Sequence, residues 1–128
     1  MIRRISSDSP YEDVIGYSRA VVAGPFVLVS GCTATVDGQV RHEGDAYEQA
    51  RTALRIALEA IEKAGAAVTD VVRTRMYVVD MADSDAVGRA HAEVFRDVRP
   101  AASMIQAAGF IDPRMLVEIE VEAYREGL

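Results

Sequence analysis

The sequence reads Val117-Glu118-Ile119-Glu120-Val121-Glu122-Ala123 close to its C-terminus. Apolar and acidic residues alternate strictly in this stretch, and a period of two residues is typical of a β-strand and not of a helix. Residues 116–124 are therefore predicted to form a strand with three carboxylates on one face and apolar side chains on the other.

Two further strands are predicted upstream of this one. Residues 101–107 form a run that a turn around residues 109–113 separates from the last strand. Residues 71–79 also alternate. One face of that strand carries Arg73, Arg75 and Tyr77, and the other carries Thr74, Met76 and Val78.

The first half of the chain begins with strands. Residues 2–5 form a short first strand, and the turn-forming Ser6-Ser7-Asp8-Ser9-Pro10 follows it. Residues 19–23 and 25–30 are rich in β-formers and flank Gly24-Pro25, which predicts a hairpin. Asp37-Gly38 predicts a second hairpin.

Two helices are predicted between the strands. Residues 45–64 have the i, i+3, i+4, i+7 pattern of an amphipathic helix, which ends at Gly65. Its apolar stripe consists of Ala46, Ala50, Ala53, Leu54, Ala57, Ile61 and Ala64. Asp83 is a suitable N-cap for a second helix, and Pro100 stops that helix. The apolar face of the second helix carries Val87, His91, Val94 and Phe95.

The order of these elements is β-hairpins, helix, strand, helix and two strands. This order predicts a two-layer α+β domain in which two helices cover one face of a mixed sheet. A chain of 128 residues has the size of one domain, and no repeat or linker divides it. We therefore expect a single domain over residues 1–128.

Composition limits the partners and the compartment. A net charge of −6 with scattered arginines disfavours binding to nucleic acid, which depends on clustered Lys and Arg. The longest apolar run, residues 20–29, is too short to span a bilayer, and the N-terminus lacks the apolar core of a secretory signal. Cys32 is the single cysteine and cannot form an internal disulfide. We expect a cytoplasmic protein with no membrane and no nucleic-acid partner.

Six short stretches, in one order along most of the chain, carry a family resemblance. They are Ile15-Gly16-Tyr17, Val27-Leu28-Val29-Ser30-Gly31, Asp70-Val71-Val72-Arg73-Thr74, Tyr77-Val78-Val79-Asp80, Arg99-Pro100-Ala101-Ala102-Ser103 and Leu116-Val117-Glu118-Ile119-Glu120. Together they resemble the Rid (reactive intermediate deaminase) family, also called YjgF-type or endoribonuclease L-PSP. The resemblance implies a chorismate-mutase-like fold and a homotrimer with three ligand clefts at the subunit interfaces.

The resemblance also implies an activity. Deaminases of this family hydrolyse enamines and imines released by pyridoxal-phosphate enzymes, without a cofactor of their own. An arginine in a Pro-Ala-Arg-Ser type motif binds the substrate carboxylate through a bidentate fork, and a glutamate on the last strand positions or activates water. Here Glu120 falls at the position of the glutamate, but the position of the arginine is Ala102, which has no donor and no charge.

Several residues are expected to bind a small metabolite in the cleft. The resemblance places there Tyr17, Ser30, Gly31, Cys32, Ala102, Ser103 and Met104. Arg75 is a further candidate, because a guanidinium from the central strand could replace the missing one. No metal ligand is expected, since neither His42 nor His91 has a partner at metal-ligand spacing.

Simpler structural roles remain open for these residues. Glu120 could be one of three solvated carboxylates, and Tyr17 an ordinary half-buried aromatic residue. Arg75 could form a salt bridge with a neighbouring carboxylate. A lone cysteine such as Cys32 is more often a small buried residue than a reactive thiolate. Arg114, in the turn before the last strand, is expected to be solvated.

Two classes of function are consistent with these observations. The first is a cofactor-independent hydrolytic deaminase of a small enamine or imine, with Glu120 as the group that handles protons. The alternative is a non-catalytic trimer that binds a small metabolite. A nuclease role rests only on a name of the family, and the acidic charge disfavours it.

Overall fold

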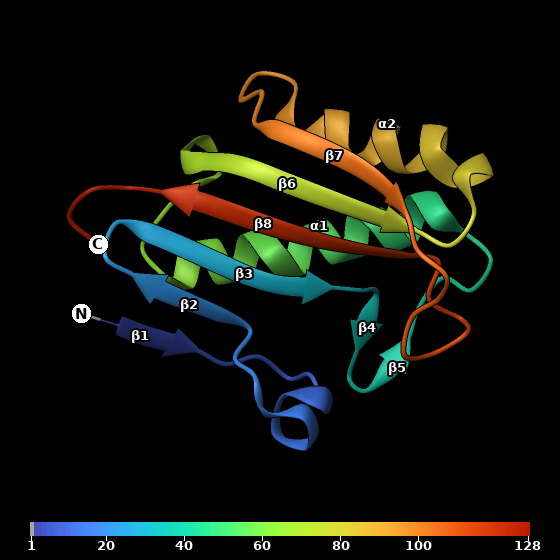
Figure 1. Ribbon diagram of the computed structural model, residues 1–128, viewed down its shortest axis with the longest axis horizontal. Helices are drawn as coiled ribbons and strands as arrows, with labels where there is room; N and C mark the ends of the chain where they lie inside the picture. Colours follow the sequence, from blue (N-terminus) through green and yellow to red (C-terminus); the bar gives the residue numbers. More distant parts are fainter. Residues whose placement is uncertain (1) are drawn as a thin grey trace.

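The described residues, 2–128 of a computed structural model, form a mixed six-stranded sheet covered on one face by helices (Figure 1). Met1, the first residue of the expected domain, lies outside the described part. The strands of the sheet are β1 (Ile2–Ile5), β2 (Ala20–Ala23), β3 (Phe26–Cys32), β6 (Val71–Val78), β7 (Ala101–Gln106) and β8 (Val117–Tyr124). Their order is β1-β2-β3-β8-β6-β7, and only the β6–β7 pair in this sheet is parallel.

The strand with alternating carboxylates lies near the centre of this sheet, between β3 and β6. Its apolar residues Val117, Ile119, Val121 and Ala123 are fully buried. Helix α1 (Ala46–Lys63) packs against β8 and β3, and helix α2 (Ser84–Phe95) packs against α1. The α+β fold with both α-helices on one face of a mixed sheet is confirmed.

Helix α1 follows the prediction closely. Its N-cap Asp45 accepts a hydrogen bond from the backbone N–H of Glu48 at 3.0 Å. Gly65 follows its end with a φ of +94°, a left-handed conformation that glycine adopts at low cost. The predicted apolar stripe is buried along its whole length.

The second helix begins directly after Asp83, as predicted, but it lacks the expected side-chain cap and ends several residues before Pro100. Asp83 has helical backbone angles and makes no capping bond, because the chain enters the helix through a 3₁₀ turn, Met81–Asp83. Asp80 caps that turn by accepting from the N–H of Ala82 at 2.9 Å. At the other end the helix stops before Pro100, since Arg99 turns into the left-handed region with its N–H bonded to the carbonyl of Phe95.

Several smaller elements connect the strands and helices. The strands β4 (Thr35–Val36) and β5 (Gln39–Val40) form the hairpin predicted from Asp37-Gly38, both of which have positive φ angles. A π-helical turn, Glu12–Gly16, lies between β1 and β2 and was not predicted from the sequence. A 3₁₀ turn, Val68–Asp70, precedes β6.

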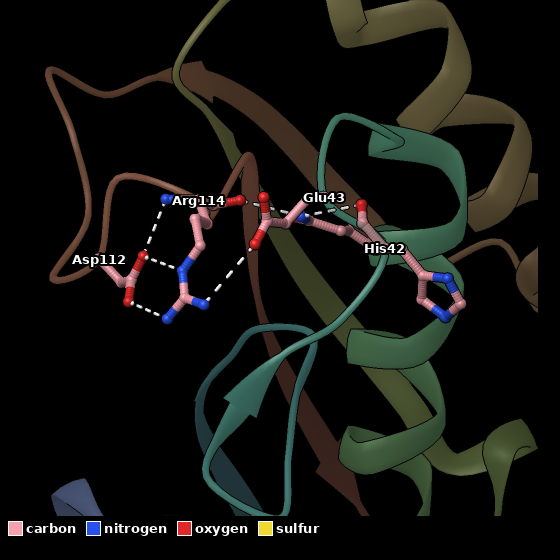
Figure 2. A network of polar contacts seen from close by, with 5 residues as sticks. His42, Glu43, Asp112 and Arg114 are labelled. Carbon is pink, nitrogen blue, oxygen red and sulfur yellow. Dashed lines mark hydrogen bonds and ion pairs between the residues drawn. The ribbon is translucent and has the colours of Figure 1, made fainter.

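The loop between β7 and β8 is tied to the start of α1. The buried side chain of Gln49 donates to the carbonyls of His42 at 3.2 Å and Arg114 at 3.0 Å, and accepts from the N–H of Leu116 at 2.9 Å. Figure 2 shows the guanidinium of Arg114 paired with Asp112 and reaching Glu43. Arg114 thus holds the loop by ion pairs at the surface.

Candidate functional site

A cavity of about 400 Å³ opens where the N-terminal segment, the end of β3, the β4–β5 hairpin, α1 and the β7–β8 loop meet. Four of the predicted cleft residues line it together, namely Tyr17, Ser30, Gly31 and Cys32. Pockets of this size hold small metabolites. The structure therefore brings these four predicted residues together around one cavity.

An irregular end of β3 creates the shape of the cavity. The register between β3 and β8 shifts between Val29 and Cys32, so Ser30 and Gly31 bulge out of the ladder. Ser30 instead forms hydrogen bonds with the segment before β2. Its N–H donates to the carbonyl of Arg19 at 2.9 Å, and its hydroxyl donates to the carbonyl of Ser18 at 2.7 Å. The bulge exposes backbone and small side chains to the cavity.

Glu118 lies directly over Gly31 in the cavity wall. A Cβ atom built on Gly31 would be 2.6 Å from Oε2 of Glu118, so any larger residue there would displace the carboxyl. Burial raises the pKa of Glu118, and the charge of Glu120 raises it further, whereas the Arg19 guanidinium lowers it. A carboxyl in such surroundings is able to exchange a proton closer to neutral pH than a solvated one.

Arg19 is a buried cation in the same wall. Only 5% of its surface is exposed, and its Nη1 donates to the carbonyl of Gly31 at 2.9 Å and to Sγ of Cys32 at 3.3 Å. Its Nε donates to the hydroxyl of Ser7 at 3.2 Å. Arg19 therefore supplies positive charge to the wall of the cavity.

Cys32 is buried beneath the bulge. Burial raises the pKa of its thiol to about 11, although Arg19 acts in the opposite direction. The thiol donates to the carbonyl of Ser30 at 3.3 Å. The environment of Cys32 is that of a small, protonated core residue and not that of a reactive thiolate.

Glu120 and Arg75 lie on the face of the sheet that the helices leave open. The hydroxyl of Tyr77 donates to Oε1 of Glu120 at 2.8 Å, and this bond raises the pKa of Tyr77. Arg75 forms an ion pair with Glu122 at 2.8 Å, with each side chain about a third exposed. The salt bridge considered for Arg75 is thus confirmed. Within residues 2–128, the cavity wall includes Glu118 but neither Glu120 nor Arg75.

The remaining predicted residues lie on the edge strand β7. Parallel pairing with β6 places Ser103 beside Arg75 on the open face, and it places Ala102 and Met104 beside Thr74 and Met76 on the helix-covered face. β8 and β6 separate this strand from β3. A single chain therefore does not bring these three residues to the cavity.

Sequence reasoning missed Arg19 and Glu118 as cavity residues. Arg19 was assigned only to the start of a strand, and Glu118 only to an acidic face. One signal was available for Arg19, a charge two residues after Tyr17 at the head of an apolar run. No such signal exists for Glu118, because its contact with Gly31 depends on the shifted register.

The described residues 2–128 contain no cluster of three or more His, Cys, Asp and Glu side chains placed to hold a metal ion. None of the helices in that part of the chain is both long and apolar enough to cross a membrane.

Known proteins resemble this chain over almost its whole length. The family model described as endoribonuclease L-PSP matches residues 8–125. An uncharacterized protein of Streptomyces coelicolor is 48% identical over 124 residues, which cover 97% of this chain and 92% of that protein. The 3-aminoacrylate deaminase RutC of Acinetobacter baylyi is 33% identical over 109 residues, 84% of this chain and 86% of that enzyme.

The fold agrees with these matches. The crystal structure of a Mycobacterium tuberculosis member of the YjgF family superposes with a TM-score of 0.87 at 44% identity, covering 97% of this chain and 99% of that chain. The family expected from the six sequence stretches is confirmed. The chain belongs to the endoribonuclease L-PSP family, which is also known as the YjgF or Rid family.

Proposed function

We propose that this protein deaminates a small enamine or imine by hydrolysis, without a cofactor, in a cleft built on the cavity at Tyr17, Ser30 and Gly31. The observation that carries this proposal is the convergence of these residues with the half-buried carboxyl of Glu118 around one metabolite-sized cavity. Similarity to a protein named as an aminoacrylate deaminase supports the reaction class.

The proposed assembly is a homotrimer, with each cleft completed by a neighbouring copy. Within one chain, two strands separate β3 from the strand that carries Ala102, Ser103 and Met104, so a second copy has to bring these residues to the cavity. The open face of the sheet supports such contacts, because large apolar side chains are exposed there beside the carboxylates of β8. They include Phe26, Leu28 and Ile105.

The reaction adds water to a C=N bond. Where a neighbouring copy extends the cleft beyond the single-chain cavity, Glu120, which lies beside Glu118 on the same face of β8, accepts a proton from the water as its oxygen bonds to the imine carbon, and the nitrogen gains a proton. The resulting carbinolamine loses ammonia as the C=O bond forms, so that R₂C=NH and H₂O give R₂C=O and NH₃. Glu118, with its raised pKa, is suited to deliver a proton to the nitrogen. An enamine enters the same route after protonation at carbon.

A non-catalytic trimer that binds a metabolite is the second candidate. Ala102 favours this candidate, because an alanine at the position of the family's arginine cannot hold a substrate carboxylate. The two candidates share a cavity and a ligand class, and they differ in turnover alone.

Turnover distinguishes the two candidates. We would generate 2-aminoacrylate and bulkier 2-imino acids in situ, with a dehydratase or an amino-acid oxidase, and follow the release of ammonia with and without this protein. We expect acceleration, and a loss of about 10²-fold or more in Glu120→Gln. Glu62→Gln, an exposed carboxylate on α1, is the matched control. Absence of acceleration by the wild-type protein would favour the metabolite-binding trimer.

A further inference from the structure

Arg19 has donors that the protein itself does not use fully. Its Nη1 has carbonyl and sulfur partners and its Nε has the hydroxyl of Ser7, but Nη2 has only the hydroxyl of Tyr17, at a long 3.5 Å. A guanidinium carries five N–H donors in one plane, two of them on Nη2. The outer edge of the guanidinium therefore retains capacity for an acceptor.

The charge of Arg19 also lacks a direct counterion. Among residues 2–128, no carboxylate lies within 4.0 Å of its guanidinium. Glu12 is connected to it only through the hydroxyl of Ser7, and Glu118 acts through space. Burial of a charge without a direct partner is unfavourable, and an anion in the cavity would relieve that penalty.

The other cations of the cavity wall are placed differently. Arg55 and Lys63 line the same cavity from α1, but Lys63 is exposed, and Arg55 has more than half of its side chain exposed and its Nη1 paired with Glu59 at 3.3 Å. Arg75 is paired with Glu122 outside the cavity. Arg19 is thus the buried guanidinium of this wall with a free edge.

We propose that Arg19 binds the carboxylate of the ligand in this cavity and so takes over the task of the guanidinium that is absent at Ala102. The inference rests on the proposed function for the identity of the ligand as a small 2-imino acid or its 2-oxo acid product. Arg19 lies between Tyr17 and the bulge at Gly31, so a carboxylate held by Nη2 leaves the rest of a small substrate near Glu118.

Binding, measured without turnover, tests this assignment. The intact protein is titrated with 2-oxobutanoate and with the neutral 2-oxobutanamide, and dissociation constants are obtained from NMR shifts. We expect the acid to bind more tightly than the amide. In Arg19→Gln the acid should bind about tenfold more weakly or worse, with the amide changed by about twofold at most. Arg51→Gln, which removes an exposed cation of α1 outside the cavity wall, should leave both constants unchanged.

A readout on the wild-type protein covers the case in which Arg19→Gln does not fold. The Nε–H resonance of Arg19, identified by its absence in Arg19→Lys, should move with the acid and not with the amide. An unmoved resonance, wild-type affinity of Arg19→Gln for the acid, or an equal loss in Arg51→Gln would overturn the assignment. Failure of the deaminase proposal is a separate result, since Arg19-dependent binding would persist without turnover.

Discussion

Glu118 is the residue at which the environment most alters a titration relevant to function. Because burial raises its pKa in the folded state, the folded protein holds this proton to higher pH than the unfolded chain does. The stability linked to Glu118 is therefore complete below about 4.5, the usual pKa of the group, and is lost as pH rises through the raised value.

Glu118→Gln removes this pH-dependent loss of stability, because a glutamine side chain does not titrate. We expect the free energy of unfolding of the variant, relative to the wild type, to increase as pH rises from about 4 to about 7. The charged groups nearest to Glu118 in this titration are Arg19 and Glu120, and both remain in the variant. Urea denaturation at several pH values measures the difference. Equal pH dependence in Glu118→Gln and in the control Glu62→Gln would show that Glu118 titrates like a solvated carboxylate.

The position of the Glu118 carboxyl requires a glycine at residue 31. A methyl group there would overlap Glu118 at 2.6 Å, so Gly31→Ala should lower the free energy of unfolding by about 1 to 3 kcal/mol. Gly88→Ala in α2 is the matched control. Its added methyl group meets no described atom within 4 Å, and it should stabilise the helix by about 0.5 to 1 kcal/mol. A neutral effect of Gly31→Ala would mean that the Glu118 side chain moves aside without cost and that its position does not require Gly31.

At the scale of elements, the hydrogen bonds of Gln49 fix the position of the β7–β8 loop. This loop carries the cavity residues Ile111 and Met115. Gln49→Leu leaves the carbonyls of His42 and Arg114 and the N–H of Leu116 without this partner, which should cost about 1 to 3 kcal/mol. Hydrogen exchange should increase across residues 107–116. Arg114→Ala removes only exposed ion pairs and should change stability by at most about 1 kcal/mol. Equal exchange in both variants would argue against the tether.

Elements with a strong periodic or turn signal were predicted well, whereas features that depend on a single cap, one backbone conformation or a shifted register were not. The stripe on α1, the Asp37-Gly38 turn and the alternation of β8 each depend on neighbours in sequence. The entry to α2 depends on Asp80 capping a preceding turn, and its exit depends on the left-handed Arg99. In the same way Tyr17 and Ser30 followed from the family resemblance, whereas Arg19 and Glu118 depend on the β3 bulge, for which the sequence has no marker.

At the scale of the whole molecule, the open face of the sheet suggests assembly. Exposed apolar residues such as Leu28 and Ile105 share this face with ionic pairs such as Arg75–Glu122. We expect light scattering to give about three times the 13.9 kDa mass of one chain. A charge introduced at the edge strand, Ile105→Glu, should dissociate the assembly, while Met81→Glu in the exposed 3₁₀ turn before α2 should not. A monomeric wild-type protein would contradict the interfacial cleft.

The family assignment followed from the sequence, but the arrangement of charge in the molecule did not. The resemblance pointed to Ala102 as a missing cation, and the sequence offered Arg75 as its replacement. The fold shows that Arg75 is engaged by Glu122, and that a different guanidinium, Arg19, is buried in the cavity wall. The sequence places Arg19 close to Tyr17, but only the fold shows that its guanidinium is buried against Gly31 and Cys32 in the cavity wall.

The most direct test of hydrolysis in this cavity is the rate at which a 2-imino acid is converted to its 2-oxo acid in the presence of this protein. The substrate is the 2-imino acid formed from 2-aminobutanoate by an oxidase, and the proteins compared are the wild type and Gly31→Ala at equal folded concentrations. We expect the wild type to accelerate formation of 2-oxobutanoate in proportion to its concentration, and Gly31→Ala, with Glu118 displaced, to lose most of that effect. No acceleration by the wild type, or equal acceleration by the variant, would contradict hydrolysis in this cavity.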